Sequence, residues 1–195
     1  MTDPPLAIRS LLVLGGARSG KSRYAQKLVE VSGRRPVLIA TAEASDDEMT
    51  ARIARHAAER NSAWQLIEES VALAATLRRE ARIERILVVD CVTLWLAKLL
   101  MSGGEHEPAT SQLVETLPAL EGPVIFVSNE VGGGIVPDNA VARGFRDAQG
   151  FLNQALAQAC DAVVRVTAGI PLRLKPAPEP QFEFRSRGEQ GYSAK

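Results

Sequence analysis

The residues GGARSGKS at positions 15–22 have the types and spacing of a phosphate-binding loop. They follow an apolar run at 11–14 and precede a helical pattern, which is the context that such a loop needs. Glycines allow several backbone N–H groups to converge on phosphate oxygens, and the helix start adds the positive end of its dipole. We expect Lys21 to be a catalytic group that bridges the β and γ phosphates, and the Ser22 hydroxyl to ligate Mg²⁺. The other expected phosphate contacts are Gly15, Gly16, Ala17, Arg18, Ser19 and Gly20.

A second ligand for the metal is expected from Asp90, which ends the apolar run ILVVD at 86–90. In proteins with this loop, a carboxylate on a neighbouring strand holds Mg²⁺ together with the loop hydroxyl. Ligands of open α/β sheets bind at the carboxyl ends of the strands, where Asp90 stands. The alternative is that Asp90 only caps the helix that starts near Cys91. Because one aspartate can do both, we assign Asp90 to nucleotide and Mg²⁺ binding.

The stretch ARIARHAAER at 51–60 places a histidine among arginines. At about 100° per residue, Met49, Ile53, His56 and Arg60 fall in one narrow stripe of a helix, so the imidazole faces inward. By this spacing alone, a structural histidine is the favoured interpretation. Arg52 and Arg60, however, lie one turn on either side of His56, a geometry suited to gripping phosphates. A neutral imidazole there can attack a phosphorus atom, so both interpretations stay open.

These residues depend on strands and helices that alternate along the chain. Short β-branched runs predict strands at 11–14, 37–41, 86–90, 124–129 and 162–167, with a weaker edge strand at 64–68. Helical spacing predicts helices at 21–30, with a stop at Gly33, and at 46–60, 91–101, 111–120 and 139–159. The alternation predicts a single α/β domain of the RecA-like P-loop NTPase type, with helices on both faces of a mostly parallel sheet. We expect residues 1–10 to be an N-terminal extension, 11–175 the domain and 176–195 a flexible tail.

The composition limits the classes of partner. Lys plus Arg and Asp plus Glu both number 23 among 195 residues, and this zero net charge implies no overall attraction to nucleic acid. The hydrophobic content of 46% suffices for one core, but no uncharged apolar run is long enough for stable membrane insertion. Cys91 and Cys160 are isolated, which is typical of buried thiols in a reducing compartment. Since no secretory leader is visible either, we expect a cytoplasmic protein.

Nucleotide binding alone does not define the reaction, because kinases, ATPases, GTPases and regulators share this loop. The guanine-recognition pattern N-K-x-D of regulatory GTPases is absent. Two alternatives are a monofunctional small-molecule kinase with a structural His56 and a nucleotide-dependent regulatory ATPase. The glycine-rich loop at 129–137 is either a flexible connection or a segment whose backbone approaches a bulky substrate closely. A plain glycine-rich turn with a solvated Lys21 is disfavoured by the complete motif and its flanks.

The order of the motifs resembles the bifunctional adenosylcobinamide kinase/adenosylcobinamide-phosphate guanylyltransferase family of cobalamin biosynthesis. The resemblance covers about residues 11–175 and rests on GGARSGKSRYA (15–25), IATAEASDDEMTARIARH (39–56) with Arg60 and Trp64 following, VVDCVTLWLAKLL (88–100) and SNEVGGGIVPDNAVARGFRDAQGFLNQ (128–154). The first stretch is generic to phosphate loops. The second and fourth are much more particular to this family.

The resemblance implies two reactions on one scaffold. The enzyme would phosphorylate the aminopropanol hydroxyl of adenosylcobinamide with ATP or GTP, then transfer GMP from GTP to adenosylcobinamide phosphate, giving adenosyl-GDP-cobinamide and pyrophosphate. The family's guanylylated histidine corresponds to His56, which becomes the second catalytic residue. The match also implies a homotrimer. It adds nucleotide contacts at Ala40, Thr41, Ala42, Ala57, Ala58, Glu59, Arg60, Glu68 and Asp90.

Overall fold

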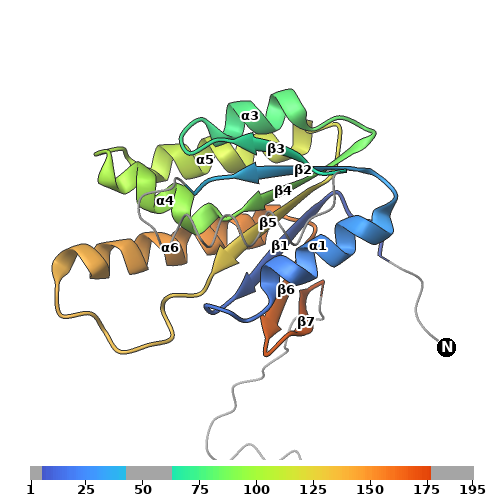
Figure 1. Cartoon of the computed structure of the whole chain (residues 1–195). Helices are drawn as coiled ribbons and strands as arrows, with labels where there is room; N and C mark the ends of the chain where they lie inside the picture. Colours follow the sequence, from blue (N-terminus) through green and yellow to red (C-terminus); the bar gives the residue numbers. More distant parts are fainter. Residues whose placement is uncertain (1–5, 43–62, 177–195) are drawn as a thin grey trace, which may run out of the picture.

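The computed structural model describes residues 6–42 and 63–176, and its centre is a seven-stranded sheet (Figure 1). The strands are β1 (Ser10–Gly15), β2 (Arg35–Ala40), β3 (Gln65–Glu68), β4 (Arg85–Asp90), β5 (Val124–Asn129), β6 (Ala162–Thr167) and β7 (Ile170–Lys175). Their order across the sheet is β3-β2-β4-β5-β1-β6-β7. All neighbours run parallel except β6 and β7, which form an antiparallel hairpin. The prediction of a mostly parallel sheet is confirmed.

Helices cover both faces of this sheet. The described helices are α1 (Lys21–Ser32), α3 (Leu73–Glu80), α4 (Val92–Met101), α5 (His106–Thr116) and α6 (Ala140–Ala159), with a 3₁₀ turn, η1 (Leu117–Ala119), after α5. α1 packs on one face, whereas α3, α4, α5 and α6 gather on the other (Figure 1). None of the described helices is long and apolar enough to cross a membrane.

The core has two apolar layers, one on each side of the sheet. Successive residues of β5 illustrate the division, because Phe126 packs into the layer under α3 to α6 and Val127 into the layer under α1. The α1 layer is completed by Ala25 and Val29, which lie one helical turn apart and are both buried. Strands buried on both faces carry apolar residues at every position, which explains why their sequences are continuous runs.

The five predicted strands and the weaker edge strand are all present, with bounds that differ by at most two residues. Two elements were not predicted. β7 alternates in sequence, but its apolar members, Ile170, Leu172 and Leu174, are exposed, and it contains Pro171, which sheets accept at an edge. α3 has only eight residues, too few for a clear helical period.

The largest difference in the helices concerns α5. The sequence predicted a helix at 111–120, but α5 begins at His106 and ends at Thr116. Pro118 explains the earlier end, because proline has no backbone N–H to continue the i→i−4 hydrogen bonds of α5, and η1 follows instead. α1 ends as expected at Gly33, which has a φ of 68°. The predicted helix at 46–60 and the tail at 177–195 lie outside the described residues.

Candidate active site

The loop between β1 and α1 requires glycine at both ends of its motif. A Cβ on Gly15 would lie 2.4 Å from Ser19 Oγ and 2.6 Å from the carbonyl oxygen of Val166. Gly20 precedes α1 with a φ of 94°, a conformation that L residues rarely adopt. Lys21 is only 6% exposed, and its Nζ donates to the Gly16 carbonyl over 2.9 Å. The loop therefore holds its lysine folded back over its own backbone.

Three predicted contacts lie in one row across the carboxyl edge of the sheet. Glu68 on β3 is in register with Ala40 on β2, and Ala40 is in register with Asp90 on β4. Neighbouring strands are about 4.8 Å apart, and side chains in register point to the same face. This face is the one that α1 covers further along the sheet, since Ala40 packs against the α1 layer. The fold thus brings the ends of β2, β3 and β4 to the same edge and face as the phosphate loop.

Thr41 fixes the turn that carries Asp90. Its hydroxyl donates to the Cys91 carbonyl over 2.6 Å and accepts from the Cys91 backbone N–H over 3.0 Å. The side chain is 2% exposed, and the peptide bond between Asp90 and Cys91 is cis. Because the Thr41 hydroxyl both donates and accepts a hydrogen bond with Cys91, the role of this side chain is to hold Asp90 in position.

The charges of Lys21 and Asp90 act at the same buried point, the thiol of Cys91. Burial raises the pKa of Cys91, the Asp90 carboxylate raises it further, and the Lys21 ammonium lowers it. Both charges therefore influence this thiol, which lies in the turn after β4. The thiol itself stays protonated and serves as a small apolar group, in agreement with the prediction that Cys91 and Cys160 are buried thiols.

The donor set around the loop fits a magnesium ion. Mg²⁺ prefers oxygen ligands and is usually held by one or two carboxylates together with substrate phosphates and water. The Ser22 hydroxyl and the Asp90 carboxylate supply such oxygens. Within residues 6–42 and 63–176, no group of three or more His, Cys, Asp or Glu side chains forms a metal cage. These residues therefore suit a magnesium site that combines the Ser22 and Asp90 oxygens with phosphate oxygens of the nucleotide.

The end of β5 separates the loop from Asp90 and contributes polar groups that sequence reasoning missed. Asn129 is in register with Gly15, and the Glu130 N–H donates to the Gly15 carbonyl over 3.1 Å. The Glu130 carboxylate pairs with the Arg165 guanidinium at 2.9 Å. The signal was the polar Ser-Asn-Glu stretch at the end of a predicted strand, but its place beside β1 depends on the strand order.

A buried polar cluster of Ser128, Gln149 and Asn153 anchors the end of β5 to α6. Ser128 Oγ donates to Asn153 Oδ1 over 2.6 Å, and Gln149 Nε2 lies within hydrogen-bond distance of both atoms. Asn153 Nδ2 then donates to the Asn129 carbonyl over 3.0 Å. The strand end next to the phosphate loop is therefore held by side chains from a helix on the opposite face.

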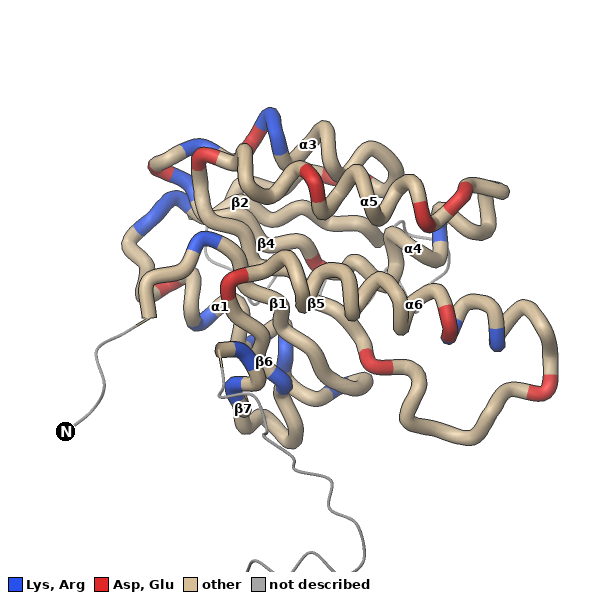
Figure 2. The backbone as a smooth tube through the Cα atoms, turned by 180° about the vertical axis from the view of Figure 1, so that it is seen from behind, with Lys and Arg blue, Asp and Glu red and all other residues tan. Residues whose placement is uncertain are grey.

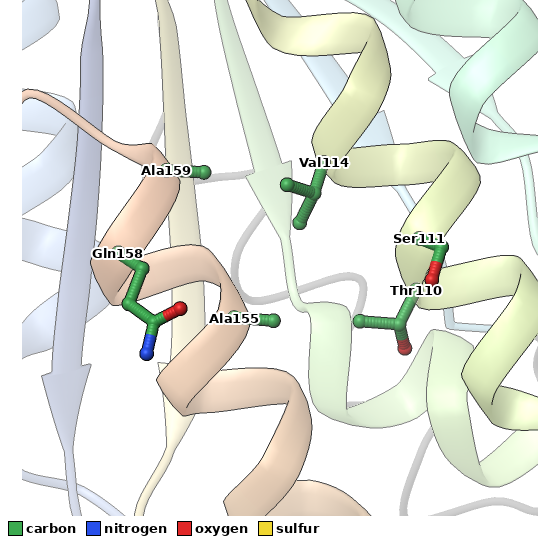
Figure 3. A pocket seen from close by; sticks show the side chains of 6 residues that line it. All are labelled: Thr110, Ser111, Val114, Ala155, Gln158 and Ala159. Carbon is green, nitrogen blue, oxygen red and sulfur yellow. The ribbon is translucent and has the colours of Figure 1, made fainter.

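The cavities in the described part of the chain include the following two. One, of about 660 Å³, adjoins the phosphate loop and is lined by Arg18, Ser19, Gly20, Arg23, Tyr24, Lys27, Leu28, Val31, Gly169 and Pro171. The other, of about 360 Å³, lies between α5 and α6 and is lined by Thr110, Ser111, Val114, Ala155, Gln158 and Ala159 (Figure 3). The second cavity is on the far face of the sheet and offers no charged side chain, so it does not belong to the phosphate site.

The structure therefore places residues 15–22, Ala40, Thr41, Ala42, Glu68 and Asp90 at one edge of the sheet. The second expected catalytic residue, His56, lies outside the described residues, as do the expected contacts Ala57, Ala58, Glu59 and Arg60.

Comparison with known proteins identifies this arrangement. Residues 11–174 match the family model described as cobinamide kinase / cobinamide phosphate guanyltransferase. The chain belongs to this family. As a cobinamide kinase / cobinamide phosphate guanyltransferase it is a bifunctional enzyme.

Two relatives match over nearly their whole length. The bifunctional adenosylcobalamin biosynthesis protein CobP of Pseudomonas aeruginosa is 49% identical over 173 residues, which are 86% of this chain and 98% of that protein. The CobU protein of Salmonella typhimurium, with the same description, is 38% identical over 182 residues, or 85% and 99%.

A solved structure supports the fold alone. An ATPase of a type III secretion system superposes with a TM-score of 0.51 at 15% identity, covering 82% of this chain and 51% of that one. The prediction of a RecA-like P-loop NTPase fold is confirmed.

Proposed function

We propose that this enzyme of adenosylcobalamin biosynthesis runs both family reactions on nucleotides whose phosphates occupy the loop at 15–22. The observation that carries the proposal is that the phosphate loop, with its buried Lys21, and the end of β4, with Asp90, lie at the same carboxyl edge of one sheet. The substrates are adenosylcobinamide and then adenosylcobinamide phosphate, with ATP or GTP as phosphoryl donor and GTP as guanylyl donor.

In the kinase reaction, the aminopropanol hydroxyl of the corrinoid attacks the γ-phosphorus. The bond between that phosphorus and the β,γ-bridging oxygen breaks, the nucleoside diphosphate departs, and the hydroxyl proton is released. Lys21 moves from the Gly16 carbonyl to the β and γ phosphates and offsets the charge that develops on them. The backbone N–H groups of residues 15–22 bind the same oxygens.

Mg²⁺ belongs to this proposal, because Ser22 and Asp90 are oxygen donors of the kind it selects. When bound, the ion supplies positive charge to the phosphates and helps to align the leaving group. Thr41 contributes by holding the Asp90–Cys91 turn through its two hydrogen bonds.

In the guanylyltransferase reaction, a neutral nitrogen of His56 attacks the α-phosphorus of GTP, and pyrophosphate departs. An oxygen of adenosylcobinamide phosphate then attacks the phosphorus of the resulting phosphoramidate, the P–N bond breaks, and His56 is regenerated. Ala40, Thr41, Ala42 and Glu68 stand at the strand ends beside the loop, which supports their assignment as nucleotide contacts. Ala57, Ala58, Glu59 and Arg60 follow His56 in sequence and complete the proposed set.

The chain contains two histidines, which gives a matched test. The enzyme is incubated with Mg²⁺ and GTP labelled at the α or γ phosphate, without acceptor. We expect covalent retention of the α label alone, loss of that label in acid, and its absence in His56→Ala. His106→Ala, altered in the first turn of α5, should retain it.

Turnover to the GDP-cobinamide product without any adduct at His56 would refute the histidine intermediate. For the kinase reaction, Lys21→Ala should lower kcat by about 10²- to 10³-fold, the cost of removing one preorganised charge donor. Undiminished cobinamide phosphorylation in that variant would refute the role of the loop.

We also propose a homotrimer that works in the cytoplasm. The loop after β5 and the adjoining α6 expose the large apolar side chains of Ile135, Val136, Val141 and Phe151, and this exposure supports an interface between copies. The two buried free cysteines are in keeping with a reducing compartment. Light scattering coupled to size exclusion measures the mass, and a monomer at micromolar concentration would contradict the trimer.

A further inference from the structure

The cavity of about 660 Å³ beside the phosphate loop is built as an extension of that loop. Arg18, Ser19 and Gly20 of the loop form one part of its lining, and Gly169 and Pro171 of the β6–β7 hairpin form another. The two parts are joined, because the Gly169 N–H donates to the Ser19 carbonyl over 2.8 Å. A Cβ on Gly20 would lie 3.2 Å from Gly169 Cα, so the turn packs directly against the loop. Any ligand in this cavity touches the phosphate loop itself.

The cavity is cationic. Arg18, Arg23 and Lys27 line it, no Asp or Glu does, and none of these three side chains bonds to another residue of 6–42 and 63–176. Several further Lys and Arg positions cluster around β6 and β7 (Figure 2). Cations that have no partner among the described residues, and that lie beside a phosphate loop, are suited to an anionic ligand whose phosphates occupy that loop.

The rest of the lining is apolar and includes one aromatic ring. Tyr24 is half-buried, and burial raises the pKa of its phenol, so the ring is neutral at physiological pH. Leu28, Val31 and Pro171 complete the surface around it. The volume falls within the range of about 300 to 1,000 Å³ that is typical of small-molecule sites, and an aromatic ring next to guanidinium groups binds flat π systems. These features fit a purine and its ribose.

We infer that this cavity holds the nucleoside of the phosphoryl donor in the kinase reaction. The inference rests on the proposed function. It adds a second direction in which the nucleoside can extend while the phosphates stay in the shared loop. β2, β3 and β4, which carry the contacts proposed for guanylyl transfer, lie on one side of β1, and β6 and β7 lie on the other. A nucleotide whose phosphates occupy this loop can thus place its nucleoside on either side of β1.

The two directions separate the two reactions. A donor nucleoside held by α1 and the β6–β7 turn leaves the strand ends at Ala40, Glu68 and Asp90 open for the corrinoid hydroxyl to approach the γ-phosphorus. The described lining offers no carboxylate, the acceptor that would pair most strongly with the N1–H and N2–H groups of guanine, so no charged acceptor selects guanine over adenine. This lining suits a kinase that uses ATP or GTP.

Photolabelling with 8-azido-ATP and Mg²⁺, followed by peptide mass spectrometry, locates the base directly. We expect the label on α1, within residues 23–31, or on the turn at 168–171. Label on the peptides that carry Ala40 or Glu68, or on neither of the expected segments, would overturn the inference. The proposed function fails separately, if Lys21→Ala labels as strongly as the unaltered enzyme.

A binding comparison gives an independent test. Tyr24→Leu keeps an apolar side chain for packing, and loss of the ring contact should weaken ATP binding about two- to tenfold. Inorganic tripolyphosphate carries the phosphates without the nucleoside, so its affinity should stay the same in that variant. Equal losses for both ligands, or no loss for ATP, would overturn the inference. Thermal denaturation establishes that the variant is folded.

The charged lining is tested in the same way. The double variant Arg23→Ala and Lys27→Ala removes two exposed cations, and we expect ATP binding to weaken about three- to tenfold. Arg78→Ala on α3 is the matched control, since Arg78 is also an exposed helical arginine but lies outside the cavity. Its ATP affinity should not change, and a double variant that behaves like this control would overturn the assignment of the cations.

Discussion

The link between Thr41 and Cys91 can be tested by replacing the hydroxyl with a methyl group of similar size. In Thr41→Val the Cys91 N–H loses its acceptor in a place where Cys91 is only 5% exposed. The Cys91 carbonyl is less affected, because it also accepts from the backbone N–H groups of Leu94 and Trp95. The substitution therefore leaves one buried donor unsatisfied, and the carbonyl keeps two partners.

The magnitude follows from that single donor. A buried N–H group left without a partner costs about 1–3 kcal/mol of unfolding free energy. For a domain of this size, 1 kcal/mol corresponds to about 2–4 °C in Tm, so we expect Thr41→Val to lower Tm by about 2–12 °C. Because Asp90 precedes the released turn, the variant should also need more Mg²⁺ for half-maximal kinase activity.

Urea denaturation and a Mg²⁺ titration of kinase activity measure the two effects. Thr116→Val is the matched control, since Thr116 is 1% exposed and its hydroxyl donates only to the Gln112 carbonyl inside α5. Thr116→Val leaves no N–H group without an acceptor, so it should lower the free energy of unfolding by less than about 1 kcal/mol. If Thr41→Val is no more destabilising than Thr116→Val, the role assigned to the Thr41 bridge is wrong.

Two further predictions concern the phosphate loop and the start of the sheet. Both Gly20→Ala and Gly33→Ala incur the cost of a positive φ, but only the Cβ at Gly20 meets backbone, at Gly169. Overpacking of this kind costs about 1–3 kcal/mol, so Gly20→Ala should be the more destabilising by about that amount in urea denaturation, and similar costs would contradict this. Burial alone would raise the pKa of Asp161, but hydrogen bonds from the Arg9 and Ser10 N–H groups outweigh it and lower the pKa. The stability advantage over Asp161→Asn should be full above about pH 4 and shrink as the pH falls through the lowered pKa, and urea midpoints independent of pH would contradict the assignment.

The local parts of the site were predictable because they need only neighbours in sequence. Residues 15–22 and Asp90 each stand where an apolar run stops, and in a parallel sheet such ends share one edge. Glu68 and Ala40 were assigned as nucleotide contacts through the resemblance. That they stand in register with Asp90 is known only from the strand pairing.

The parts that sequence reasoning missed join residues far apart along the chain. The donor cavity combines α1 with the turn at Gly169 and Pro171, and β7 was not predicted, so no lining from this hairpin was expected. Likewise, nothing local indicates that Thr41 bonds to Cys91, because β2 and β4 become neighbours only through the strand order. Their positions depend on long-range packing, which hydrophobic periodicity does not report.

The polar cluster of Ser128, Gln149 and Asn153 has a consequence for how α6 settles during folding. Apolar contacts tolerate small rotations of a helix about its axis, whereas a set of directional bonds is satisfied at one angle. A slip of one residue, about 100°, would leave the Ser128 hydroxyl and the Asn129 carbonyl buried without these donors. The cluster thus selects a unique rotational setting of α6 and, with it, the point where the chain enters the long loop before that helix.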